Sequence, residues 1–280
     1  MHVVILSIGG IIIKLCSEIT GLMLHVKSDY KDHVLSEEPC SCDTELHIVL
    51  TGTNTARNTS GNNSDNGILY KEARVGYHIK YMADFRFAEM RCDVINAVYE
   101  NFERVILFLL SNVCINSNKL LLHCSALRNE LNQVFLFFGP SKIGKSTIAK
   151  KLTSLQLISD DLVVLERDDQ QHTIFKTPFD RNTIANSRQK MPCQIAGIYR
   201  LLQEDETKRE RLTSVQAILL LAGNVWMLDY STESYHRMLP LLHRLIKGVP
   251  VYSLSTRFTD SGKDILQILN LQYERRYNRV

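Results

Sequence analysis

The segment from Val134 to Glu166 constrains the fold of this chain more than any other part of the sequence. It reads VFLFFGPSKIGKSTIAKKLTSLQLISDDLVVLE, an apolar run followed by a glycine loop and then a stretch with apolar residues available to one helical face. In a strand, loop and helix of this kind, backbone N–H groups and the positive helix end converge on an anion. The segment therefore predicts an α/β fold with an anion-binding loop.

The loop itself matches the pattern G-x-x-x-x-G-K-[ST] in full, from Gly139 to Ser146. Gly139 and Gly144 permit backbone angles and a close approach that a Cβ atom would obstruct. Lys145 is expected to neutralise phosphate charge, and the Ser146 hydroxyl is expected to ligate Mg²⁺. ATP and Mg²⁺ are the predicted ligands. The candidate cofactor-binding residues are Gly139, Pro140, Ser141, Lys142, Ile143, Gly144, Lys145, Ser146 and Thr147.

A pair of carboxylates, Asp160 and Asp161, follows the loop after a short interval. Only a short helix, a turn and one strand fit between Lys145 and Asp160, so both carboxylates should lie at a strand end beside the loop. One carboxylate can hold Mg²⁺, and the other can accept a proton from an attacking hydroxyl. Together with the loop, these groups would suffice for phosphoryl transfer. The alternative is that the pair begins a solvated turn, as the Asp168–Asp169 pair does later.

The rest of the chain predicts a mixed α/β sheet preceded by a small β-rich region. Gly9-Gly10 between two β-branched runs predicts a hairpin turn, and apolar spacing predicts a buried helix over 99–113. We expect a β-rich N-terminal region over 1–80 and a kinase-type domain over 81–280, with a polar loop at 51–67. The expected strands are 3–8, 11–15, 22–26, 46–50, 120–127, 133–138 and 249–258; further helices are expected from Thr213, from Ser234 and at the C-terminus.

Composition excludes several classes of protein. The formal net charge of the 280 residues is +3 with both signs interspersed, which gives no support for a nucleic-acid or membrane partner. The N-terminal apolar run is shorter than the roughly 20 residues of a spanning helix, and Lys14 interrupts it. Seven cysteines, an odd number, predict reduced thiols and a cytoplasmic location. His33, Cys40, Cys42 and His47 could form a zinc site, but a single C-x-C favours free thiols.

Three segments in order, LLLHCSA, GPSKIGKST and LISDD, resemble the catalytic domain of HPr kinase/phosphorylase, whose fold is similar to that of PEP carboxykinase. The resemblance covers roughly 85–270. It implies that Lys145 and Ser146 bind phosphate and Mg²⁺ and that Asp160 is the base toward a target serine. It also implies that Asp161 lies at the metal and that His123 is a catalytic residue close to the phosphates, as is Lys145; a core histidine is the alternative for His123. The resemblance is compatible with a homo-oligomer, because HPr kinases form ring-like oligomers.

The sequence departs from that family after the acidic pair, where its glycine-rich signature is missing. This departure puts phosphorolysis and HPr as a substrate in doubt. Arg181 and Arg188 lie in that region and are candidate contacts to phosphate or substrate, with ordinary surface arginines as the alternative. The overall layout resembles lasso-peptide tailoring kinases, which phosphorylate the C-terminal serine of a precursor peptide. We therefore expect an ATP-dependent kinase acting on a serine of a peptide or small protein. The alternatives are a small-molecule kinase and a non-catalytic nucleotide-binding regulator.

Overall fold

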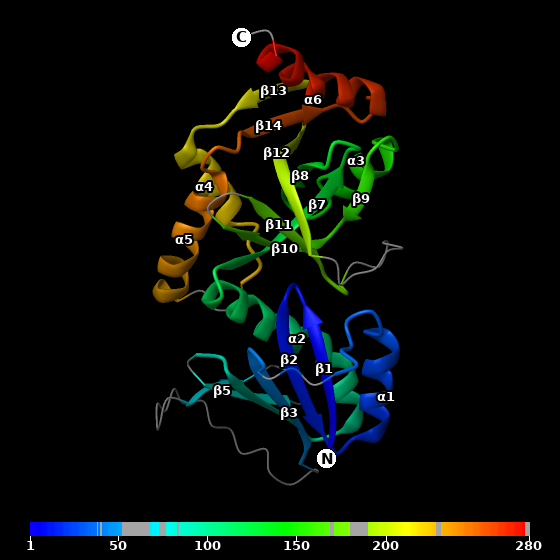
Figure 1. Ribbon diagram of the computed structural model, residues 1–280, viewed down its shortest axis with the longest axis vertical. Helices are drawn as coiled ribbons and strands as arrows, with labels where there is room; N and C mark the ends of the chain where they lie inside the picture. Colours follow the sequence, from blue (N-terminus) through cyan, green and yellow to red (C-terminus); the bar gives the residue numbers. More distant parts are fainter. Residues whose placement is uncertain are drawn as a thin grey trace. The chain divides into compact units, whose positions relative to one another are not determined.

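A computed structural model of the chain describes residues 1–37, 39, 41–51, 68–72, 77–82, 84–168, 171–179, 190–227 and 231–277 (Figure 1). The chain divides into two compact units, one formed mainly by Met1–Ser117 and the other mainly by the chain from Asn118 onward. The predicted polar loop, apart from Thr51, lies outside the described residues, as do Cys40, Arg181 and Arg188.

The first unit contains a mixed six-stranded sheet in the order β1-β2-β3-β6-β5-β4. Strand β3 is parallel to both of its neighbours, β2 and β6, whereas the pairs β1–β2, β6–β5 and β5–β4 are antiparallel. Gly9 and Gly10 have φ angles of 63° and 71°, which suits the tight turn between β1 and β2. The predicted hairpin is thus confirmed. The strands are β1 (His2–Ile8), β2 (Ile11–Ser17), β3 (Thr44–Leu50), β4 (Ile68–Glu72), β5 (Tyr77–Met82) and β6 (Phe87–Cys92).

Two helices accompany this sheet, α1 (Thr20–Asp29) and α2 (Ile95–Asn116). The rings of Tyr30 and Phe102 meet edge to face, with 5.8 Å between their centroids, so the end of α1 is packed against α2. The strand predicted over 22–26 is wrong, because that segment lies within α1. Its buried residues Leu22, Met23 and Val26 have the spacing of one helical face.

Helix α2 confirms the helix predicted over 99–113 and extends it at both ends. It belongs with the first unit, where it packs on β2, β3, β5 and β6. The sequence-based boundary near residue 80 therefore differs from the division of the structure, which falls after Ser117. A buried helix gives no local signal of which sheet it covers, and this explains the difference.

The second unit is built on an eight-stranded mixed sheet in the order β11-β10-β7-β8-β12-β14-β13, with β9 paired to β7. Strands β8, β12 and β14 are parallel to one another, and β7 runs antiparallel to β8, β9 and β10. The bounds are β7 (Lys119–Arg128), β8 (Gln133–Phe138), β9 (Gln156–Ser159), β10 (Leu162–Arg167), β11 (His172–Lys176), β12 (Met191–Gln203), β13 (Lys208–Arg211) and β14 (Val251–Thr256).

The core of the second unit includes an aromatic row across its three parallel strands. Tyr199 of β12 stacks on Phe137 of β8 and on Tyr252 of β14, at centroid distances of 5.4 and 5.5 Å. Residues of α3 (Lys145–Lys151) and α6 (Gly262–Tyr277), among them Ile148 and Ile265, belong to the same buried cluster. The two helices thus cover one face of the three parallel strands, and the glycine loop follows directly after one of them, β8.

Two further helices, α4 (Ser214–Ala222) and α5 (Thr232–Ile246), complete the second unit. Thr213 caps α4 through a capping box with Gln216, as the sequence predicted for this start. Helix α5 begins earlier than predicted, because Ser231 rather than Ser234 is its N-cap. Within the described ranges, no helix has the length and apolar character needed to cross a bilayer. The six cysteines described there are all free thiols.

Candidate functional site

The register of β7 explains why the predicted site residues meet. The first half of β7, up to His123, pairs with β10, whereas its second half, from Cys124, pairs with β8 and β9. Cys124 lies opposite Phe138, the last residue of β8, and His123 lies opposite Leu162, the first residue of β10. The end of β8, the end of β9 and the start of β10 therefore converge beside His123.

The glycine loop leaves β8 directly at this point, and the strand and helix predicted around it are confirmed as β8 and α3. Three of its residues have positive φ angles: 151° at Gly139, 67° at Lys142 and 108° at Gly144. When residues in the left-handed backbone conformation stand next to residues in the right-handed one, successive backbone N–H groups point to the same side. This geometry is suited to binding anions. Both loop glycines are thus needed for backbone reasons, while Ser146 and Thr147 are exposed at the start of α3.

Lys145 is the most buried of the predicted cofactor-binding side chains, with 7% of its surface exposed. Its Nζ atom donates hydrogen bonds to the carbonyl oxygens of Gly139 and Pro140, at 3.0 and 3.2 Å. Burial lowers the pKa of Lys145, and the negative charge of Asp161 acts in the opposite direction. The ammonium group is therefore held inside the loop, within electrostatic reach of a carboxylate.

The two carboxylates differ in their surroundings. Asp160 is buried, with 8% of its surface exposed, and its backbone carbonyl accepts a hydrogen bond from the Ser125 hydroxyl at 3.4 Å. The side chain of Asp161 is half exposed, and its Oδ1 lies 3.2 Å from Nε2 of His123. The structure thus brings Asp161 into contact with His123 and within electrostatic reach of Lys145.

A neighbouring strand fixes the glycine loop from the other side. Gln203, the last residue of β12, donates a hydrogen bond from Nε2 to the Ile143 carbonyl at 3.2 Å. Trp226 lies edge-on to the His123 ring, with 6.5 Å between centroids. Sequence reasoning did not select these two residues. The only available signal was that Trp226 is the single tryptophan of the chain.

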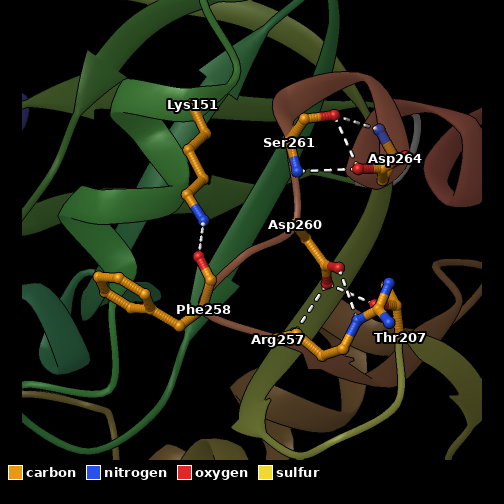
Figure 2. Close-up of polar contacts among 7 residues, drawn as sticks. All are labelled: Lys151, Thr207, Arg257, Phe258, Asp260, Ser261 and Asp264. Atoms are coloured by element: carbon orange, nitrogen blue, oxygen red, sulfur yellow. Dashed lines mark hydrogen bonds and ion pairs between the residues drawn. The ribbon is translucent and has the colours of Figure 1, made fainter.

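The chain after β14 is fixed by a group of polar contacts (Figure 2). Buried Asp260 accepts hydrogen bonds from the backbone and side-chain nitrogens of Arg257, at 2.7 and 3.0 Å, and from the Thr207 hydroxyl. Lys151, the last residue of α3, donates to the Phe258 carbonyl at 2.8 Å. This network ties α3 to the segment that joins β14 and α6.

Replacing Asp260 with asparagine should therefore destabilise the second unit. Burial raises the pKa of Asp260, but its hydrogen bonds from Thr207 and Arg257 outweigh burial and leave it below the ordinary 3.8. A carboxyl group whose pKa is depressed by folding stabilises the folded state at pH values above its ordinary pKa. This contribution is lost as the pH falls through the pKa of the folded state. We expect a loss of about 2 kcal/mol in unfolding free energy at pH 7, and a smaller loss near pH 3.

Chemical denaturation at both pH values measures this effect. Asp264→Asn is the matched control, because Asp264 is an exposed carboxylate that hydrogen-bonds only to Ser261 among the contacts drawn in Figure 2. We expect a smaller destabilisation from the control at pH 7. Equal losses from both substitutions would show that the buried network does not brace this segment.

The chemical groups of the site are suited to binding a nucleotide together with Mg²⁺. The loop offers positive-φ backbone and an ammonium group for phosphate oxygens. The exposed hydroxyl of Ser146 and the half-exposed carboxylate of Asp161 are oxygen ligands of the kind Mg²⁺ prefers. The donor set thus fits both predicted ligands.

Comparisons with known proteins add little to this geometry. No protein-family model matches the sequence, and no curated protein gives a significant match. Among solved structures, the chain is similar to the Hpr(Ser) kinase/phosphatase from Coxiella burnetii. The alignment covers 56% of this chain and 98% of that chain, at 13% sequence identity and a TM-score of 0.35. A likeness this low carries no conclusion about function, which has to rest on the residues of the site.

Proposed function

We propose that this chain is an ATP-dependent, Mg²⁺-requiring kinase that transfers the γ-phosphoryl group to a serine hydroxyl of a peptide or small protein. The proposal rests chiefly on the convergence at β7, where the glycine loop with Lys145 adjoins the Asp160–Asp161 pair. Phosphoryl transfer depends mainly on positioning, on neutralising charge and on an oriented nucleophile. The groups of this site are suited to all three tasks.

In this proposal, the loop N–H groups and Lys145 bind the phosphates. Ser146 and Asp161 hold Mg²⁺, which supplies further neutralisation of phosphate charge when bound. Asp160 accepts the proton that leaves the serine hydroxyl as its oxygen bonds to phosphorus and ADP departs. The contact of His123 with Asp161 supports a positioning role, because it orients a carboxylate that must face the metal.

The choice of a peptide serine as acceptor rests on the resemblance in layout described above. The C-terminal serine of a lasso-peptide precursor is the most specific form of this proposal. A peptide acceptor needs an accessible reaction centre, and the half-exposed side chain of Asp161 agrees with that need. Phosphorolysis is not part of the proposal.

Incubating the full chain with γ-labelled ATP and serine-containing peptides tests the proposal, with and without Mg²⁺. The matched control replaces the acceptor serine of each peptide with alanine. We expect label in the serine peptides only, and only with Mg²⁺ present. Label found solely in a small metabolite would indicate a small-molecule kinase. ATP binding without transfer to peptides, proteins or metabolites would indicate a nucleotide-binding regulator.

A further inference from the structure

Three side chains with metal-binding atoms meet on one face of the sheet in the first unit. Strands β2 and β3 are parallel, and their register places Cys16 opposite His47 and Lys14 opposite Glu45. Side chains two residues apart on a strand point to the same face. Glu45 and His47 therefore lie on one face of β3, and Cys16 reaches the same face from β2.

The ligand atoms of this group converge on one carboxylate oxygen. His47 Nε2 lies 2.6 Å from Oε1 of Glu45, and the Cys16 thiol lies 3.6 Å from the same oxygen. One sulfur, one nitrogen and one oxygen are all within 4.8 Å of one another, the only such group of metal-ligating residues among those that the structure describes. The ring of Phe87 lies against His47 at 5.1 Å and restricts its orientation.

One of these separations matches those around a tetrahedral zinc ion, and a second needs a small movement. With Zn–S near 2.3 Å and Zn–N or Zn–O near 2.0–2.2 Å, two ligands of such an ion lie roughly 3.3–3.6 Å apart. The distance from Cys16 to Glu45 already matches this value. His47 and Glu45 are closer because they share a hydrogen bond, so their side chains must separate by about 1 Å.

The chemistry of the three ligands selects the class of metal. Thiolate and imidazole favour Zn²⁺ over Mg²⁺ and Ca²⁺, which take oxygen ligands. Cys16 is buried, while the side chains of Glu45 and His47 are 30% and 27% exposed, which leaves a route from solvent. We propose that Cys16, Glu45 and His47 bind one Zn²⁺ ion, with water as the fourth ligand. Binding would release the thiol proton to solvent and link β2 to β3.

This site differs from the zinc site considered from the sequence. Of that set, Cys40 lies outside the described residues, and Nδ1 of His33 lies 2.9 Å from the Ser7 carbonyl oxygen. Only His47 is common to both sets. Cys16 and Glu45 could not be chosen from the sequence, because the pairing of β2 with β3 skips the intervening helix α1.

Lys14 supports the rival explanation that the group is an ordinary polar cluster. Its Nζ lies 4.0 Å from Oε2 of Glu45, so the carboxylate has a cationic neighbour without any metal. A zinc ion at Oε1 would be repelled by this ammonium group. Lys14→Gln therefore serves as the control variant, since it removes a neighbour of Glu45 and leaves all three ligands in place.

The experiment uses the full chain, stripped of metal with a chelator and kept reduced, in the absence of nucleotide. Zn²⁺ binding is measured by competition with a chromophoric chelator. Co²⁺ serves as a spectroscopic substitute, because a thiolate ligand gives a charge-transfer band in the near ultraviolet. Cys16→Ser, Glu45→Gln and His47→Gln are compared with Lys14→Gln, and far-ultraviolet circular dichroism checks the folding of each variant.

We expect the unmodified chain to bind one Zn²⁺ and to give the thiolate band with Co²⁺. Each ligand variant should bind at least about tenfold more weakly, since disturbing even the residues that support a metal ligand costs that much. Lys14→Gln should bind as tightly or more tightly. If Cys16→Ser fails to fold, the two partly exposed ligand variants still decide the question. No Zn²⁺ uptake, unchanged binding in these variants, or loss with His47→Gln alone would overturn the proposal.

Discussion

Asp160→Asn is expected to lower the rate of phosphoryl transfer about 10²–10⁴-fold while leaving ATP affinity nearly unchanged. Asparagine has almost the shape of aspartate and can occupy the same buried position, but it cannot accept the proton of the attacking hydroxyl. The substitution does not touch the hydrogen bonds that Lys145 donates to the carbonyl oxygens of Gly139 and Pro140, so the loop should still bind ATP. Single-turnover transfer from labelled ATP, together with equilibrium ATP binding, measures the two effects separately.

Two other carboxylates make this prediction specific. Asp161→Asn should raise the Mg²⁺ concentration required for transfer, because it weakens the proposed metal ligand and its contact with His123. Asp168→Asn is the control, since Asp168 is an exposed residue whose Oδ1 accepts a hydrogen bond from the Gln171 backbone at 2.8 Å. Transfer should be normal in that control. Unchanged transfer by Asp160→Asn would refute its role as the base.

The parts of the fold that sequence predicted well are those specified by local patterns. The strand, loop and helix at 133–151 follow from an apolar run, two glycines and a helical face that lie next to one another in the chain. The hairpin at Gly9-Gly10 is equally local, because two glycines supply the positive φ angles that the turn needs. By contrast, the short apolar segment 22–26 is compatible with the residue spacing of a strand and with that of a helix. In the structure it forms part of a helix.

The candidate site was predictable only where its residues are close in sequence. The short interval between Lys145 and Asp161 leaves little freedom, so their proximity could be inferred before the structure was known. The contributions of Gln203 and Asp260 depend on β12 being the parallel neighbour of β8 and on β14 being the parallel neighbour of β12. That order follows from long-range pairing, which no local pattern encodes. The group of Cys16 with Glu45 was missed for the same reason.

Replacing Lys145 with methionine should lower transfer about 10²–10³-fold and should also weaken ATP binding. Its ammonium group is the buried positive charge of the loop, hydrogen-bonded to the carbonyl oxygens of Gly139 and Pro140. Methionine has a similar length and can fill the same space, but it offers no charge to the phosphates. Single-turnover transfer and equilibrium ATP binding are measured as for Asp160→Asn. The control is Lys150→Met, which removes an exposed charge from the same helix and should alter neither quantity.

Stability distinguishes a role in binding from a structural one at this position. Burial lowers the pKa of Lys145 even with Asp161 nearby. The charged form of Lys145 therefore reduces the unfolding free energy at neutral pH. If Lys145 serves to bind phosphate, Lys145→Met should leave the unfolding free energy of the nucleotide-free protein unchanged or slightly higher, while the rate of transfer falls. A marked loss of stability with normal ATP binding would instead show that its hydrogen bonds serve the fold of the loop. Denaturation of the nucleotide-free protein, paired with ATP titration, separates these outcomes because the two roles predict opposite changes.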